Sequence, residues 1–287
     1  MRKKLLSFIL AICLIIPCIF MFVACGGSPD GGSGGGGSGG GEGGNDPNWP
    51  TYSNVTYEVS NVRGGVLLED VNFSREGEFP QEFHVPKYVN GKKVVRIGCW
   101  AFRDVHQDEY TGHNWDSFND PVHNFPYNKI IVPDTVEVVD SGAFSLCTVK
   151  EIEFQGENTQ FGNLAGGYVN SLFAGCWLLE KVRLPANLTT IHQEMFQNCK
   201  SLVDIVIPNK VTYIDWLAFD GCESLETITI PASVEEIARE AFPGLRNLKT
   251  VYFEGDTVYY TDYDPETTRG GSFKRHSQWE EIQFIRI

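Results

Sequence analysis

The stretch that decides the fold is CESLETITIPASVEEIAREAF, which runs from Cys222 to Phe242. The same pattern occurs 23 residues earlier as CKSLVDIVIPNKVTYIDWLAF, from Cys199 to Phe219, and ten positions of the two copies are identical. The shared positions are almost all apolar residues, proline or cysteine, which are residue types that build a core. Repetition at a fixed period of roughly 20 to 50 residues is the sequence signature of an architecture of stacked repeats.

Further copies extend the pattern in both directions along the chain. Their shared template is L-x-x-I-x-I-P-x-x-V-x-x-I-x-x-x-A-F-x-x-C. Besides the two quoted copies, it is found, in part degenerate or incomplete, at residues 83–102, 128–147, 149–176, 176–196 and 248–255. The sequence therefore predicts a repeat domain over residues 83–255.

Each copy is predicted to form one short strand, a return segment and a corner. Alternating apolar residues indicate a strand with one buried face, and Pro231 ends that strand because proline cannot donate to a strand ladder. The corner, which places Phe242 in the core, is expected to be tight or a single helical turn. One unit cannot bury its apolar side alone, but units stacked with strands about 4.8 Å apart can. The inward positions of this copy are predicted to be Ile228, Ile230, Val234 and Ile237.

The template resembles the BspA-like leucine-rich repeats of bacterial surface proteins. The blocks I-P-x-x-V-x-x-I and A-F-x-x-C carry this resemblance, because several copies agree in them. The resemblance implies a right-handed leucine-rich-repeat solenoid with short parallel strands and about 23 residues per repeat. It also implies display outside the cell and adhesion to a protein or glycan of a host or of a neighbouring cell. Fold alone does not define a ligand.

The N-terminus is predicted to be an export signal. Residues 1–24 begin with MRKK and continue as an uncharged apolar run, which is typical of a signal peptide. The run ends in Phe22-Val23-Ala24-Cys25, which resembles the lipobox of bacterial lipoproteins and implies lipid modification of Cys25. We therefore expect a protein anchored by lipid to the bacterial cell membrane and facing outward. The alternative is an uncleaved N-terminal membrane helix.

Three further segments flank the repeats. Residues 25–50 contain Cys25 and a glycine-rich linker, which is expected to behave as a flexible coil. Residues 51–82 alternate like a hairpin and are predicted to cap the N-terminal end of the solenoid, while residues 256–287 are predicted to cap the other end. The net charge of −14 argues against nucleic acid as a partner.

Four cysteines occupy the same template position: Cys147, Cys176, Cys199 and Cys222. The template makes them small inward-facing residues, and we predict a column of buried free thiols. Two alternatives remain: a disulfide between neighbouring repeat units, which we call rungs, and a metal site. A single column cannot surround a tetrahedral metal ion, which disfavours the second.

The segment 103–127 is an insertion relative to the template. Its histidines, His106, His113 and His123, lie among carboxylates and make a metal site conceivable, although the spacing matches no known metal motif. Its aromatic residues are candidates for contact with a partner, because such side chains often anchor interfaces. The alternative is that the insertion packs onto the flank of the solenoid. These aromatic candidates are Tyr110, Trp115, Phe118 and Tyr127.

Strand positions that alternate with the buried ones are expected to line one exposed face. From this face we select as candidate partner-binding residues Lys181, Arg183, Thr227, Thr229 and Tyr252. Charges change sign from copy to copy, so no uniform electrostatic field is expected. A plain solvated face is the alternative interpretation of the same positions.

Catalysis has little support in the sequence. No nucleophile elbow, metalloprotease motif or phosphate-binding glycine loop is present. Glu151 and Glu153 lie two apart on one predicted strand, at a spacing that superficially matches glycosidase carboxylates. We predict a lipid-anchored, non-catalytic protein without a cofactor that binds a protein or glycan. The alternatives are an envelope spacer without a ligand and an enzyme whose site lies in the insertion 103–127.

Overall fold

The computed structural model describes residues 37–40, 49–73, 81–102, 127–162, 171–259, 271–273 and 282–287. The chain divides into two compact units, residues 1–35 and 36–287, and all described residues belong to the second. In the described ranges every regular element is a β-strand. None of the described residues forms a helix that is long and apolar enough to cross a membrane.

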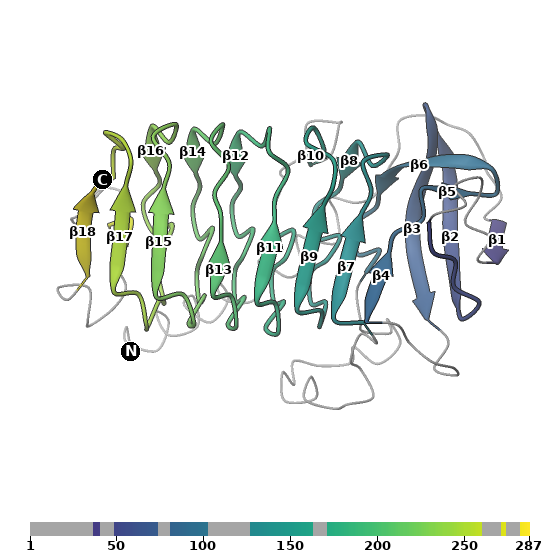
Figure 1. Ribbon diagram of the computed structural model, residues 1–287, viewed down its shortest axis with the longest axis horizontal. Helices are drawn as coiled ribbons and strands as arrows, with labels where there is room; N and C mark the ends of the chain where they lie inside the picture. Colours follow the sequence, from purple (N-terminus) through teal and green to yellow (C-terminus); the bar gives the residue numbers. More distant parts are fainter. Residues whose placement is uncertain are drawn as a thin grey trace, which may run out of the picture. The chain divides into compact units, whose positions relative to one another are not determined.

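Eight short strands follow one another as the front row of the solenoid (Figure 1). Pairing divides this row into two parallel sheets, one of order β13-β11-β9-β7-β4 and one of order β15-β17-β18. The strands of the front row are β4 (Glu82–His84), β7 (Lys129–Val132), β9 (Glu151–Phe154), β11 (Lys181–Arg183), β13 (Asp204–Ile205), β15 (Thr227–Ile230), β17 (Thr250–Phe253) and β18 (Gln283–Arg286). The predicted leucine-rich-repeat solenoid of parallel strands is confirmed.

A second row of two-residue strands lies on the return segments, and we call it the return row. Here β8 and β10 continue a sheet that begins at the N-terminal end, while β12, β14 and β16 form a parallel sheet of their own. The strands of this row are β8 (Val138–Val139), β10 (Gln160–Phe161), β12 (Thr190–Ile191), β14 (Tyr213–Ile214) and β16 (Glu236–Ile237).

The segment predicted as a hairpin forms β2 (Val55–Val62) and β3 (Gly65–Phe73), which pair antiparallel. The outer edge of β2 pairs with β1 (Gly37–Gly40), which belongs to the glycine-rich segment. On the other side, β3 pairs in parallel with β6 (Lys92–Ile97), and β6 continues into the return row through β8. The short β5 (Tyr88–Val89) pairs antiparallel with β6. The hairpin is therefore hydrogen-bonded to the first repeat.

The core is organised around a stack of phenylalanine rings, one from each corner. Neighbouring rings have centroids 4.7–5.8 Å apart and interplanar angles of 4–19°, so they lie nearly parallel. All of them are almost completely buried. The stack consists of Phe102, Phe144, Phe173, Phe196, Phe219, Phe242 and Phe273. The apolar template positions therefore build one continuous core, as predicted.

The corners are tight turns, and in the described residues no corner contains a helical turn. In the five corners from Phe144 to Phe242, two positions four residues apart have a positive φ, which interrupts a right-handed helix. In one corner they are Leu217 (φ 53°) and Gly221 (φ 71°). Between them, the Phe219 N–H donates to the Ala241 carbonyl of the next rung at 2.9 Å. Alternate N–H groups of the corner therefore donate to the next rung, while those between them, such as the Asp220 N–H to the Leu217 carbonyl at 3.1 Å, donate within the rung.

Gly221 shows why glycine recurs at the second of these positions. A Cβ atom added there would lie 2.7 Å from Asn198 Oδ1, in addition to the unfavourable φ. Asn198 is the equivalent residue of the preceding rung and has φ 58°. Asparagine tolerates this conformation better than other residues with a side chain, so both residue types fit the position.

The cysteine column consists of free thiols, as predicted. Cys147, Cys176, Cys199 and Cys222 are all buried, and none of them forms a disulfide. The thiol of Cys176 donates to the Phe144 carbonyl at 2.9 Å, and those of Cys199 and Cys222 donate to the carbonyls of Phe173 and Phe196, each at 3.2 Å. Burial raises the pKa of the thiols of Cys176, Cys199 and Cys222.

We predict that this column is protected from alkylation in the folded protein. Alkylating reagents attack the thiolate, which a raised pKa and complete burial both suppress. Brief treatment with iodoacetamide at neutral pH should leave peptides containing Cys176, Cys199 and Cys222 unmodified, whereas the same treatment in urea should modify them. Peptide mass spectrometry measures both fractions, with the partly exposed Cys99 as an internal reference. Rapid modification of Cys199 without urea would contradict this prediction.

The last strand extends the front row beyond residue 255, where the sequence predicts a cap. Strand β18 pairs in parallel with β17, in the register Thr250 to Gln283. Phe273 stacks on Phe242 with centroids 4.7 Å apart, although the two residues are 31 positions apart in the sequence and not 23. The extra residues hide the period from a search for a fixed repeat.

Candidate binding surface

The front face is the set of side chains that point outward from the front row. Strand register confirms that they stand in two columns. The first column contains Glu82, Lys129, Glu151, Lys181 and Asp204, and the second contains His84, Ile131, Glu153 and Arg183. On the second sheet the columns continue with Thr227, Thr250 and Gln283, and with Thr229, Tyr252 and Ile285.

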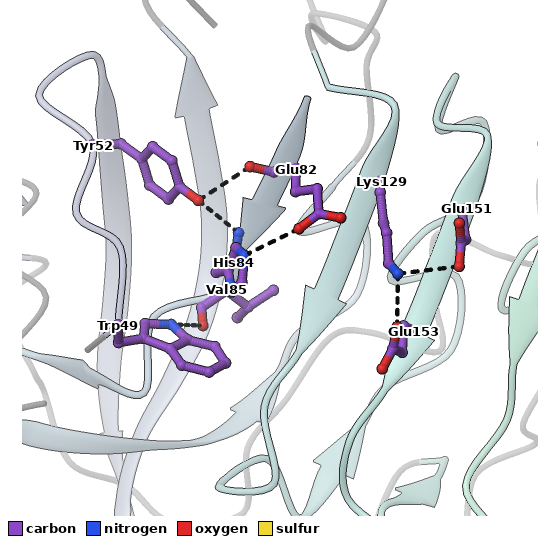
Figure 2. Close-up of polar contacts among 8 residues, drawn as sticks. All are labelled: Trp49, Tyr52, Glu82, His84, Val85, Lys129, Glu151 and Glu153. Carbon is purple, nitrogen blue, oxygen red and sulfur yellow. Dashed lines mark hydrogen bonds and ion pairs between the residues drawn. The ribbon is translucent and has the colours of Figure 1, made fainter. Parts of the chain in front are cut away.

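Charges along the first sheet form ion pairs with one another. Lys129 lies 3.2 Å from Glu151 and 2.7 Å from Glu153 (Figure 2). Arg183 lies 3.0 Å from Glu153, and Lys181 lies 3.2 Å from Asp204. The alternation of sign that the sequence shows therefore becomes a network of ion pairs. We call the face over β4 to β11, with Asp204 of β13, the charged half.

The contact between Lys129 and Glu153 shifts the pKa of both groups. The hydrogen bond from Lys129 lowers the pKa of Glu153, against the opposing effect of burial. Burial also acts against the charge of Lys129, but its hydrogen bonds to Glu153 and Glu151 outweigh this effect and raise its pKa. Glu153 is therefore ionised at neutral pH. An ionised, paired carboxylate is not suited to act as the general acid of a glycosidase.

His84 lies at the end of the charged half, next to the segment that precedes the hairpin (Figure 2). Its ring meets the Trp49 ring edge-on, with centroids 5.0 Å apart, and its Nε2 lies 3.6 Å from a Glu82 carboxylate oxygen. The His84 backbone N–H donates to the Tyr52 hydroxyl at 2.9 Å. The Trp49 indole N–H donates to the Val85 carbonyl, also at 2.9 Å. These contacts hold residues 49–52 against the first strand of the front row.

A shallow open depression of about 290 Å³ lies beside this contact. It is lined by Pro50, Tyr52, Gln81, Glu82 and His84. The Nδ1 atom of His84 is buried and has no hydrogen-bond partner among the described residues. Among the residues that the structure describes, no group of three or more His, Cys, Asp or Glu side chains could hold a metal ion.

Histidine titration should make the fold less stable in mild acid. Burial lowers the pKa of His84 and of His192 from the ordinary value near 6.5. The unfolded chain then binds more protons than the folded chain, so the contribution of these residues is complete above about pH 6.5 and is lost as the pH falls below that value. Urea unfolding followed by circular dichroism at about pH 7.5 and about pH 5.5 should show this loss.

The matched control is the double variant His84→Gln, His192→Gln. It should lose less stability than the wild type over the same pH interval, because glutamine does not titrate. An equal loss in both proteins would assign the pH dependence to other groups.

The second sheet presents a different face, which carries no charged side chain at its two column positions. Its outward side chains are hydroxyl, amide, aromatic or aliphatic groups. Thr227 and Thr229 are exposed, and Tyr252 is partly exposed. On the adjoining rung of β13, Val206 is 72% exposed and Val203 is 58% exposed. We call Val203, Val206 and the outward residues of β15, β17 and β18 the uncharged half.

The structure brings five of the predicted binding residues together on one face. Lys181 and Arg183 lie in the charged half, whereas Thr227, Thr229 and Tyr252 lie in the uncharged half. Tyr110, Trp115, Phe118 and the proposed lipidation site Cys25 lie outside the described residues, as do His106, His113 and His123.

Tyr127 corrects one prediction. It is only 1% exposed, and its ring packs against those of Phe83, Tyr52 and Phe73, with centroids 5.1–5.9 Å apart. Burial raises its pKa to about 12. As a core residue, it cannot contact a partner from the folded surface.

Sequence reasoning found one feature of this surface and missed another. Val206 falls on an outward position of the template, so the repeat predicts its exposure, although it is not among the selected partner-binding residues. Trp49 precedes the repeats, and no periodic signal in the sequence connects it with His84.

Parallel front strands, the phenylalanine stack and the tight corners define a leucine-rich-repeat protein. Two overlapping regions, residues 122–249 and 168–283, match the family described as BspA type leucine rich repeat region, with six copies. Together they span more than half of the chain, so the protein belongs to the BspA-type leucine-rich repeat family. No curated protein matches the sequence.

Solved structures of bacterial leucine-rich-repeat proteins are similar to this chain. A T. pallidum protein is 20% identical over 68% of each chain, with a TM-score of 0.38. A leucine rich cell surface protein from Faecalibacterium prausnitzii A2-165 is 21% identical over 75% of this chain, with a TM-score of 0.43. A Bacteroides ovatus ATCC 8483 protein is 20% identical over 70% of this chain, with a TM-score of 0.38. The matches span 56% and 46% of the latter two proteins.

Proposed function

We propose that this protein is an exported, lipid-anchored surface protein whose front face binds a protein or glycan partner. The observation that carries the proposal is the front face itself, where two columns of outward side chains run in register across each front sheet. Repeat arrays of this kind suit recognition of a large, extended partner across several rungs. Membership of the BspA-type family supports an interaction module.

The proposed role is non-catalytic. The carboxylates that most resemble an enzyme site, Glu151 and Glu153, both pair with Lys129 on an open face. An envelope spacer without a ligand is the competing function, and it makes a different prediction about binding.

A binding screen distinguishes these functions. The purified chain is tested by biolayer interferometry, at physiological salt, against extracellular-matrix proteins, mucins and glycans. One variant changes the front face (Arg183→Ala, Thr229→Ala), and a second changes the insertion (Tyr110→Ala, Trp115→Ala). We expect saturable binding that the front-face variant weakens. Loss only in the insertion variant would move the site to the insertion, and no binding to any panel member would favour the spacer.

Export and anchoring have a separate test. Residues 1–24 and Cys25 support a lipoprotein signal, so the wild type should fractionate with membranes. The Cys25→Ser variant should fail to acquire lipid, as measured by mass spectrometry of its N-terminal peptide. An intact N-terminus in the membrane fraction would instead support the uncleaved membrane helix.

A further inference from the structure

The front row changes its chemistry at the β13 rung, next to the point where its sheet divides. In the described range 171–259, β11 pairs with β13 and β15 pairs with β17, but no strand pairing joins β13 to β15. Outward side chains of the first column alternate in charge from Glu82 to Asp204 of β13, whereas Val206 on the β13 rung and the column positions of β15, β17 and β18 are uncharged. The front face therefore consists of two surfaces with different requirements for a ligand.

A charged ligand would have to compete with existing ion pairs in the charged half. Lys129 already contacts both Glu151 and Glu153, and Arg183 contacts Glu153 from the opposite side. Lys181 is likewise paired with Asp204. Separating these partners would forfeit attractions that the free protein already has, so the net gain for a ligand on this half is small.

The uncharged half has the composition of an interface core with a polar rim. Val206 and Val203 are 72% and 58% exposed, and Ile285, at the far side of Tyr252, is 36% exposed. Aliphatic side chains left in water gain roughly 25 cal/mol for each Å² that a partner covers. At the margin, Lys249 pairs with Glu226 at 2.8 Å, and Arg286 pairs with Asp256. Exposed aliphatic side chains at positions without charge, bordered by charges that are already paired, match the depletion of charge at the centre of protein–protein interfaces.

We infer that the partner docks on the uncharged half and presents an uncharged, aliphatic protein segment to Val206, Thr229 and Tyr252. This inference rests on the proposed function and specifies its site and the class of partner. The absence of charge at the column positions of β15, β17 and β18 disfavours a charged segment, which would lose hydration without gaining an opposite charge. The threonine hydroxyls can hydrogen-bond to the partner's backbone.

A glycan fits this surface less well than a protein segment does. Covering Val203 and Val206 with sugar hydroxyls would take those hydroxyls out of water against side chains that cannot hydrogen-bond. An aliphatic side chain would gain from the same contact. Glycan binding is therefore an outcome that would contradict the inference.

The test uses a displayed library of random 12-residue peptides, selected on the full chain purified in detergent. We expect enrichment of peptides that are uncharged and rich in aliphatic residues. Val206→Asp should weaken the binding of an enriched synthetic peptide by about tenfold or more, because it places a charge in the contact. The matched control is Val258→Asp, since Val258 is also well exposed, at 55%, but pairs with Glu236 in the return row. This control should bind the peptide as the wild type does.

Other outcomes separate this inference from the proposed function. Enrichment of charged peptides whose binding is lost in Arg183→Glu and retained in Val206→Asp would overturn the inference and leave the proposed function standing. Binding to glycans of the panel without any enriched peptide would have the same meaning. Failure to bind any peptide, protein or glycan would overturn both. Circular dichroism of both aspartate variants checks that each is folded.

Discussion

Replacing Phe219 by alanine should lower the free energy of unfolding by about 3–5 kcal/mol, the range for large-to-small substitutions at buried aromatic sites. The Phe219 ring is completely buried and stacks on Phe196 and Phe242, with centroids 5.2 and 4.8 Å away. The substitution leaves a cavity and removes two ring contacts from the middle of the stack. Phe196 and Phe242 are each held on their other side by a stacked ring, Phe173 and Phe273, so neither can move into the cavity without losing that contact.

Urea unfolding followed by far-ultraviolet circular dichroism measures this effect. Phe219→Leu is the control, because it keeps most of the apolar volume and removes mainly the ring stacking. It should cost clearly less than alanine. A loss below about 1 kcal/mol for Phe219→Ala would contradict the expected cost of such a cavity. It would mean that the Phe219 ring contributes little to the free energy of unfolding.

The second large effect is expected at the ion pair between Arg96 and Asp140, which joins the first two rungs. The Arg96 guanidinium holds the Asp140 carboxylate through both oxygens, at 2.6–3.1 Å, and the Asp140 side chain is only 7% exposed. Asp140→Ala should cost about 3–5 kcal/mol, because removing one partner of a buried ion pair takes away the carboxylate that the other charge was buried against. The same unfolding assay applies.

Two comparisons make this prediction specific. Asp256→Ala breaks the exposed pair with Arg286 and should cost at most about 1 kcal/mol. The double variant Arg96→Met, Asp140→Leu removes both charges together and should recover much of the loss, because apolar pairs of similar volume can replace buried ion pairs. If the double variant were as unstable as Asp140→Ala, packing around the site would outweigh the charge effect.

The repeat makes most of the solenoid predictable from the sequence. Alternation at Ile228 and Ile230 predicts a strand with one buried face, and the spacing of the cysteines predicts a column of buried thiols. Register between rungs follows from the period, so the outward columns that contain Lys181, Arg183 and Thr229 can be assigned from the repeat alone. These features all depend on local periodicity, which a single sequence contains.

Features that depend on long-range packing cannot be predicted in the same way. Tyr127 belongs to a polar insertion whose aromatic residues suggest contact with a partner, but it packs into the core with Tyr52 and Phe83. The template allows corners that are tight or helical, and only the backbone shows that residues such as Leu217 adopt positive φ to pair with the next rung. The division of the front row between β13 and β15 has no signature in the template.

The phenylalanine stack has a consequence for how proteins of this kind can diversify. Phe102 and Phe144 are 42 positions apart in the sequence, and Phe144 and Phe173 are 29 apart, yet each pair stacks as the 23-residue pairs do. Lengthening a connection costs little chain entropy, about 0.6 kcal/mol per doubling. The corner of Phe102 and the return segment after Phe161 are thus insertion sites. New sequence can be added there while the neighbouring rungs keep their register. A repeat protein built this way can acquire binding loops without a change in the repeats themselves. Foreign peptides inserted at these two sites should therefore be displayed on an unchanged solenoid.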